Sequence, residues 1–232
     1  MTAGDVALVA AATGRVLETL RDGLDRLGEP SPLPGWTRAH VATHLARNAD
    51  SFTWLLDGAR VGERREQYPG GPATRAAAIE AGSARAAEEV VADVERAAAR
   101  LAAAWARMDE ASWSGPVGLS AGDVPARELV WARLREVEVH HTDLGLGYEP
   151  HRWAAEFVDR ELPRRIDGLA ARLPLGTAVR LVRTGAGETW EMGAGPASVT
   201  VTGPGHAILA WALGRDAAGL DAPAGLPPLA PW

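Results

Sequence analysis

TRAHVATHLARN (37–48) and REVEVHHTDL (135–144) are the two stretches that decide the fold of this chain. Both have the composition and spacing of helices. Glu136 and His140 are four residues apart, so a helix places them on one face, and a second helix packed alongside can bring His44 to the same point. Two imidazoles and one carboxylate leave one coordination position open, which is the arrangement of catalytic rather than structural zinc. The two stretches therefore predict a catalytic metal site.

The spacing alone leaves other ligands open. His40 and His44 are also four residues apart, and Glu138 and His141 are three apart. The apolar stripe of the second stretch includes His141 rather than His140, so His141 is kept as an alternative ligand or as a residue behind the ligands. One isolated histidine is more often a hydrogen-bonded core residue, but three ligand-type residues on two facing helices favour a metal site.

Apolar residues recur at helical spacing through the first two thirds of the chain. Thr37 is a good N-cap, Trp36 and Val41 are spaced for a hydrophobic staple, and Pro125 suits the first turn of a helix. Polar residues 61–72 contain Gly and Pro and predict a loop that could serve as a lid, whereas 112–124 reads as irregular. Four amphipathic helices predict an antiparallel bundle, and we expect them over about residues 3–27, 38–56, 74–108 and 124–146.

The pattern changes after Gly147. A helix over about 152–172 is expected to bend at Pro163, and short alternating segments rich in β-branched residues then predict strands. We place the domain boundary near 148–152, with a bundle over 1–149 and a small α+β domain over 150–232. The strands are expected over residues 178–183, 188–192 and 198–202, followed by a helix over 205–214.

Composition restricts the chemistry. All 24 basic residues are Arg, and the chain has no Cys, so a Schiff-base lysine, a disulfide and a Cys-based zinc site are excluded, and any reactive thiol must come from outside. A net charge of −6 argues against a nucleic-acid partner, and Arg64 and Arg65 form only a doublet rather than a basic cluster. The N-terminal segment lacks a basic region, and no apolar stretch approaches roughly 20 residues. We expect a cytoplasmic protein without a membrane partner.

Two further motifs have competing interpretations. GLSAG (118–122) matches a nucleophile-elbow pattern centred on Ser120, but that pattern requires a preceding strand and a following helix in a parallel sheet. We therefore disfavour it. Arg215 ends the last expected helix, where it either interacts with the helix dipole or binds a carboxylate.

PGWTRAHVATHLARNAD (34–50), YPGG (68–71), EVEVHHTDL (136–144) and WALGR (211–215) together resemble the mycothiol-dependent maleylpyruvate isomerase family of DinB-like metalloenzymes. The resemblance covers nearly the whole chain and implies a DinB-like four-helix bundle followed by a small sterol-carrier-like α+β domain. It further implies zinc, or another divalent metal, on His44, Glu136 and His140. Arg215 matches the functional arginine of the family, so that the active site would lie where the two domains meet.

The activity implied by this resemblance is the conversion of maleylpyruvate to fumarylpyruvate. The thiolate of mycothiol would add to the cis double bond, the resulting single bond would rotate, and elimination would leave a trans bond, with Arg215 holding a substrate carboxylate. Three alternatives remain: a mycothiol S-transferase, an iron oxygenase with the same three ligand types, and a non-catalytic bundle. The partners expected are a small-molecule substrate and a low-molecular-weight thiol, in a monomer or small homo-oligomer.

Overall fold

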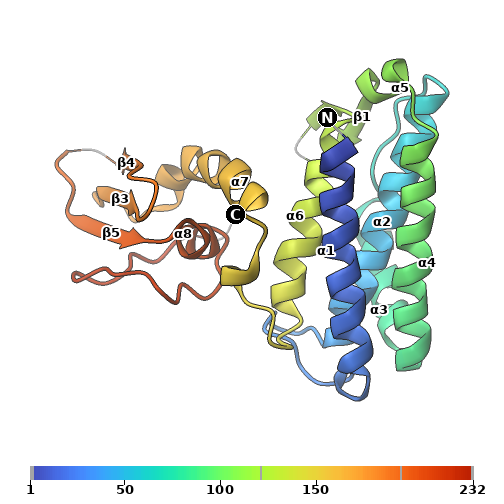
Figure 1. The fold of residues 1–232 in the computed structure, drawn as a ribbon, viewed down its shortest axis with the longest axis horizontal. Coiled ribbons are helices and arrows are strands. Elements are labelled where there is room, and N and C mark those ends of the chain that lie inside the picture. Colours follow the sequence, from blue (N-terminus) through green and yellow to red (C-terminus); the bar gives the residue numbers. More distant parts are fainter. Residues whose placement is uncertain (1–2, 121, 194, 231–232) are drawn as a thin grey trace. The chain divides into compact units, whose positions relative to one another are not determined.

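The computed structural model describes residues 3–120, 122–193 and 195–230, and it divides into two compact units, Met1–Tyr148 and Glu149–Trp232 (Figure 1). The first unit is helical apart from a short hairpin, and the second carries a small sheet with helices. The predicted α+β class is therefore confirmed.

Four helices lie side by side in the first unit (Figure 1). The helix α2 packs on α4 and α6, while α1 packs on α6 and α4. Fully buried leucines from each helix form the core, among them Leu20, Leu45, Leu55, Leu101 and Leu134. The four helices are α1 (Ala3–Asp22), α2 (Arg38–Arg60), α4 (Ala87–Ala106) and α6 (Glu128–Asp143).

The helix directions refine the predicted antiparallel arrangement. Ion pairs between α2 and α4 advance in the same sense along both helices, so these two neighbours run parallel. Two parallel neighbours need a connection that brings the chain back to the end of the bundle where the first helix began. A loop and the additional helix α3 (Gly71–Ser83), which lie between α2 and α4 in sequence, form this connection. By contrast, α2 and α6 run antiparallel, which sets His44 opposite Glu136. The α2–α4 pairs are Arg47–Asp93, Asp50–Arg100 and Asp57–Arg107.

The start of α2 follows the sequence prediction. Thr37 is the N-cap: its hydroxyl oxygen accepts from the backbone N–H of His40, and the His40 ring accepts from the backbone N–H of Thr37. This reciprocal capping box satisfies two N–H groups that a helix start otherwise leaves without partners. The helix continues to Arg60, four residues beyond the expected end.

The predicted single helix over 74–108 is wrong, because the chain turns after Gly82 and Ser83. Arg85 stabilises this turn: its backbone N–H and its guanidinium both donate to the Gly82 carbonyl, and it pairs with buried Asp93 at 2.6 Å. A Cβ on Gly82 would lie 2.4 Å from the side chain of Thr43, so Gly82 lets α3 approach α2 closely. Alanine favours a helix on both sides of the break and therefore gives no signal for it.

Residues 112–124 are more regular than expected. They contain part of the short helix α5 (Glu110–Ser114) and most of an antiparallel hairpin, β1 (Pro116–Leu119) and β2 (Gly122–Pro125). Pro125 ends β2 opposite Pro116 instead of opening a helix, and α6 begins three residues later. Ser120 lies exposed in the hairpin turn, so the strand–helix setting of a nucleophile elbow is not formed around it.

The second unit contains the three predicted strands in the order β4-β3-β5, with β3 antiparallel to β4 and parallel to β5 (Figure 1). The expected helix over 152–172 is split into three shorter pieces, and Pro163 lies within the central one. The helices α7 and α8 pack on each other. The elements are η2 (Pro150–Arg152), α7 (Ala155–Asp167), η3 (Leu169–Arg172), β3 (Val179–Arg183), β4 (Thr189–Met192), β5 (Val199–Gly203) and α8 (Gly205–Ala212).

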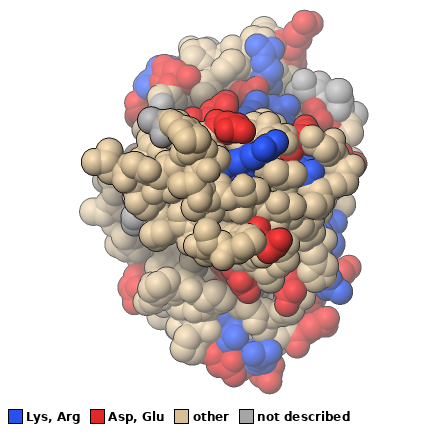
Figure 2. Space-filling model, turned by 90° about the vertical axis from the view of Figure 1, so that its left-hand side faces the viewer, with Lys and Arg blue, Asp and Glu red and all other residues tan. Residues whose placement is uncertain are grey.

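Surface charge is mixed in sign. Figure 2 shows acidic and basic side chains interspersed on one face of the molecule, among a larger area of uncharged residues. Within the described ranges, none of the helices combines the length and the apolar character needed to cross a bilayer.

Candidate metal centre

Two facing helices bring together the three residues singled out from the sequence. His44 projects from α2, and Glu136 and His140 project from one face of α6. Nε2 of His44 lies 2.9 Å from Oε2 of Glu136, and Nε2 of His140 lies 3.6 Å from the same oxygen. One ligand atom from each residue lies within 4.8 Å of the other two. The three side chains thus converge on one point.

This geometry fits a divalent metal ion. Ligands at about 2.0–2.1 Å from a tetrahedral zinc lie about 3.3 Å apart, and the separations of the two histidine nitrogens from the Glu136 oxygen, 2.9 and 3.6 Å, lie on either side of that spacing. The rings of His44 and His140 meet edge to face, with centroids 4.5 Å apart. Two imidazole nitrogens and one carboxylate can therefore surround an ion and leave a coordination position for another molecule.

The protonation states suit metal binding. Burial lowers the pKa of His44 to about 4; the hydrogen bond to Glu136 opposes this shift, whereas the nearby His140 and Arg75 reinforce it. Burial acts to raise the pKa of Glu136, but the hydrogen bond from His44 and the charges of His44, His140 and Arg133 outweigh it, so that this pKa lies below its ordinary value. A neutral imidazole and an ionised carboxylate are the forms that bind metals.

Other residues hold the ligands in position. Nδ1 of His140 lies 2.9 Å from Oδ2 of Asp143, a carboxylate that is only 2% exposed. Such a contact fixes the ring and directs Nε2 toward the metal. Nδ1 of His44 lies 2.9 Å from Nη2 of Arg75, which comes from α3. Neither Asp143 nor Arg75 was predicted from the sequence; Asp143 could have been found from its place three residues after His140, whereas Arg75 has no local signal.

A buried arginine links the two ligand-bearing helices. Arg133 is 2% exposed, and its Nη1 donates to the Leu45 carbonyl and to Oδ1 of Asn48. Burial lowers its pKa to about 10, and Glu136 opposes that shift. Arg133 therefore stays charged at neutral pH and fixes the relative positions of α2 and α6 near Glu136.

The alternative ligands on α6 serve a different cluster. Glu138 is fully buried and accepts hydrogen bonds from Arg15 and from the hydroxyl of Tyr148. His141 stacks on Tyr148 with ring centroids 3.7 Å apart, and its Nε2 lies 2.8 Å from the hydroxyl of Thr19. Arg15 and Thr19 belong to α1, so this cluster joins α6 to α1.

His40 is also committed elsewhere. Its Nδ1 takes part in the capping box with Thr37, and its Nε2 lies 3.1 Å from Glu80 on α3. Both ring nitrogens therefore have partners outside the group formed by His44, Glu136 and His140.

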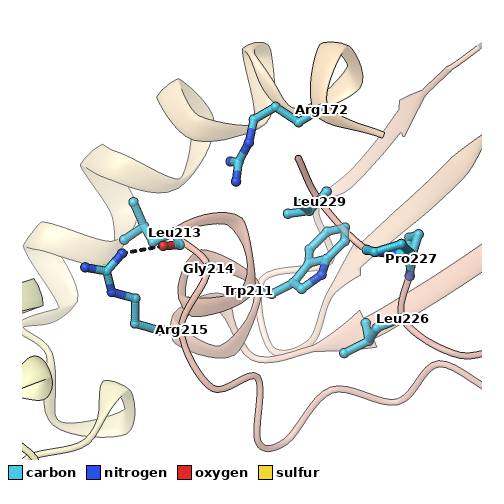
Figure 3. Close-up of a pocket in the computed structure, with 9 residues that line it drawn as sticks. Arg172, Trp211, Leu213, Gly214, Arg215, Leu226, Pro227 and Leu229 are labelled. Atoms are coloured by element: carbon cyan, nitrogen blue, oxygen red, sulfur yellow. Dashed lines mark hydrogen bonds between the residues drawn. The ribbon is translucent and has the colours of Figure 1, made fainter. Parts of the chain in front are cut away.

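Arg215 lies in the second unit, just after α8. Its Nη1 donates to the Leu213 carbonyl at 2.5 Å, and Figure 3 shows the guanidinium turned toward that carbonyl. Arg215 and Arg172 line a cavity of about 560 Å³ together with Trp211. Arg172 donates to the Ala212 carbonyl at 2.6 Å. Two arginines and a tryptophan therefore line one cavity within this unit.

Comparisons with known proteins point to one family. A family model described as the mycothiol maleylpyruvate isomerase N-terminal domain matches residues 6–145. The solved structure of a mycothiol-dependent maleylpyruvate isomerase is 28% identical, with a TM-score of 0.89 over 98% of this chain and 95% of that one. A histidine-to-alanine mutant of such an enzyme is 27% identical, with the same TM-score and coverage. The search of curated proteins gives no significant match.

Proposed function

Because the chain belongs to the mycothiol maleylpyruvate isomerase N-terminal domain family, we propose that it converts maleylpyruvate to fumarylpyruvate with mycothiol as the thiol. Relatives in this family are enzymes, and the described residues include a site fit for chemistry. The observation that carries the proposal is the convergence of His44, Glu136 and His140, within 4.8 Å of one another, at the meeting of α2 and α6.

Under this proposal, His44 and His140 hold a divalent metal, with zinc the expected ion, through their Nε2 atoms, and Glu136 holds it through its carboxylate. When bound, the ion keeps a coordinated thiol deprotonated at neutral pH, and thiolate is the reactive form. The chain itself has no Cys, so that the thiol must be a separate molecule.

The reaction balances without an added reductant or oxidant. A thiolate sulfur that adds to one carbon of the cis double bond leaves a single bond that can rotate. Loss of the same thiolate then restores the double bond in the trans form. Product and substrate have the same atoms, and the thiol is not consumed.

The side chains around the site position the reactants. Asp143 holds His140, and Arg133 holds α2 against α6 near Glu136. Arg215 is proposed to bind a carboxylate of the substrate or of the thiol, because the planar fork of a guanidinium matches the two oxygens of a carboxylate.

Metal removal tests this proposal. Protein treated with a chelator should lose thiol-dependent isomerisation and regain it with one equivalent of zinc. Turnover that survives chelation would contradict the proposed role of the three residues. Accumulation of a stable adduct between thiol and substrate would instead indicate a thiol transferase.

A further inference from the structure

We propose that Arg75 binds a carboxylate of the substrate beside the metal centre and gives up its contact with His44 to do so. The proposal rests on the proposed function, since it concerns the substrate of the same site. It adds a recognition residue from α3 to the three metal-binding side chains.

The contact between Arg75 and His44 is incompatible with metal binding through Nε2. A guanidinium only donates, so Nδ1 of His44, 2.9 Å from Nη2 of Arg75, must be the acceptor. The ring proton then lies on Nε2, which donates to Glu136. A metal binds Nε2 through the lone pair of that nitrogen, so the ring proton must then lie on Nδ1. The Nδ1–H of His44 and the N–H of Arg75 would then point at each other, and both are donors. Arg75 must therefore turn away when a metal binds.

The position of α3 keeps Arg75 close to the site after such a turn. Gly82 lies seven residues after Arg75, on the same face of α3. A Cβ on Gly82 would meet Thr43, the neighbour of His44, so that α3 is held against α2 at this point. Arg75 thus stays within reach of the metal centre through the fixed position of its helix.

The charge of Arg75 has no acidic partner among the residues that the structure describes: the guanidinium contacts the ring of His44 and lies over the ring of Tyr68, whose centroid is 5.4 Å from the guanidinium carbon. The neighbouring arginines differ: Arg47 and Arg85 both pair with Asp93. A cation next to a metal centre and without a carboxylate partner is suited to binding an anionic ligand.

A cavity provides the space for such a ligand. It has a volume of about 270 Å³, and Ser51 on its wall lies two helical turns, about 10 Å, along α2 from His44. Its walls combine apolar groups with a few polar ones. The polar lining residues include Arg47, Ser51, Gln67, Tyr68, Thr74 and Arg75.

Most polar groups of this lining are engaged. Arg47 pairs with Asp50, which Arg100 also neutralises. The hydroxyl groups of Ser51 and Thr74 donate to backbone carbonyls. The hydroxyl oxygen of Tyr68 accepts from Gln67, which leaves its own proton for another acceptor. Arg75 and Tyr68 can therefore donate to a small carboxylate in this cavity. Arg47 also has a buried Nε without a hydrogen-bond partner, but Asp50 and Asp93 already neutralise its charge.

The proposal predicts that loss of Arg75 changes zinc affinity and carboxylate affinity in opposite directions. Replacement of Arg75 by Gln removes the positive charge and the strong donor that contact Nδ1 of His44. Because this contact competes with metal binding, zinc should bind several-fold more tightly. The same replacement removes the carboxylate partner, so that a cis-dicarboxylate should bind at least about tenfold more weakly. A residue with only a structural role would weaken both.

The experiment compares the full chain with Arg75→Gln and Arg75→Lys, and with Arg21→Gln as a control, since Arg21 pairs with Glu95 at an exposed position. Zinc affinity is measured by competition with a chromophoric chelator. Maleate binding to the zinc-loaded protein is measured by calorimetry at fixed ionic strength. Arg75→Lys should bind maleate with intermediate affinity because it keeps the charge and loses the planar fork, and Arg21→Gln should match the wild type in both measurements.

Weaker zinc binding by Arg75→Gln, or maleate affinity within twofold of the wild type, would overturn the proposal. Equal helix content by circular dichroism shows that the variants are folded. If the wild type isomerises maleylpyruvate while Arg75→Gln retains its maleate affinity, only this inference fails. If the zinc-loaded wild type does not isomerise maleylpyruvate, the proposed function fails, whatever the maleate affinities are.

Discussion

Asp143 lies one helical turn beyond His140 on α6, and its carboxylate contacts Nδ1 of the His140 ring at 2.9 Å. The same helix therefore supplies a candidate metal ligand and the group that orients it. Because Asp143 is almost fully buried, its carboxylate is held in place by the surrounding bundle. This arrangement fixes the ring nitrogen that faces Glu136 and His44.

Loss of this orienting carboxylate should weaken metal binding. In Asp143→Asn the amide oxygen is a weaker acceptor, and we expect zinc affinity to fall by about 10- to 100-fold. Chelator competition measures the change, and Asp25→Asn, at an exposed position in the same unit, serves as the control. Equal zinc affinities of Asp143→Asn and the wild type would show that Asp143 does not position His140.

Replacement of His44 by Ala should abolish both stoichiometric zinc binding and turnover, because two ligands remain of three. His40→Ala is the matched control, since His40 lies one turn earlier on α2 and contacts Thr37 and Glu80 instead. Metal analysis of protein purified without an affinity tag, together with a thiol-dependent assay, checks this prediction. Activity retained by metal-free His44→Ala protein would refute the assignment.

The variant Glu138→Gln tests whether the cluster of Glu138, Arg15 and Tyr148 contributes to stability without contributing to metal binding. The change removes a charge that Arg15 and Tyr148 stabilise in a fully buried position, so that the free energy of unfolding should fall by about 1–3 kcal/mol. Zinc stoichiometry should stay at one per chain. Urea unfolding and metal analysis test the two statements, and a variant of normal stability that has lost its zinc would instead make Glu138 a ligand.

Asp93 should give the first unit a defined acid sensitivity. Burial acts to raise the pKa of Asp93, but the hydrogen bond from Arg85 and the charges of Arg47 and Arg85 lower it by more than burial raises it. The folded-state pKa therefore lies below the unfolded one. As pH falls, the unfolded chain is protonated first, and the stability contributed by Asp93 is lost below about pH 5, as pH falls through the unfolded and then the folded pKa.

The difference in melting temperature between the wild type and Asp93→Asn should therefore be largest near neutral pH and should shrink as the pH falls below about 5. Thermal unfolding followed by circular dichroism at several pH values measures it. A difference that is independent of pH would mean that the charge of Asp93 contributes nothing to stability.

The convergence of the three candidate ligands was accessible from the sequence because it depends on regular geometry. Glu136 and His140 share a face through the helical period, and Thr37 marks the start of the helix that carries His44. The pattern did not decide which of the neighbouring histidines and acidic residues are the metal ligands. That choice depends on partners distant in sequence, such as Arg15, which holds Glu138 against α1.

Other features arise only from tertiary contacts. The turn between α3 and α4 depends on Arg85 reaching Asp93 and on the fit of Gly82 against Thr43, and neither is visible in a run of alanines. Pro125 is compatible both with a helix start and with a strand end, and its pairing with Pro116 decides for the strand. Arg75 reaches His44 only because α3 folds back along α2.

The most direct test of the central claim follows the reaction itself. Zinc-loaded protein is incubated with maleylpyruvate, with and without mycothiol, and the products are observed by NMR. Fumarylpyruvate that forms only when mycothiol is present, with no net consumption of the thiol, is the result we predict. The absence of fumarylpyruvate under these conditions, or its formation at the same rate without the thiol, would contradict the proposed function.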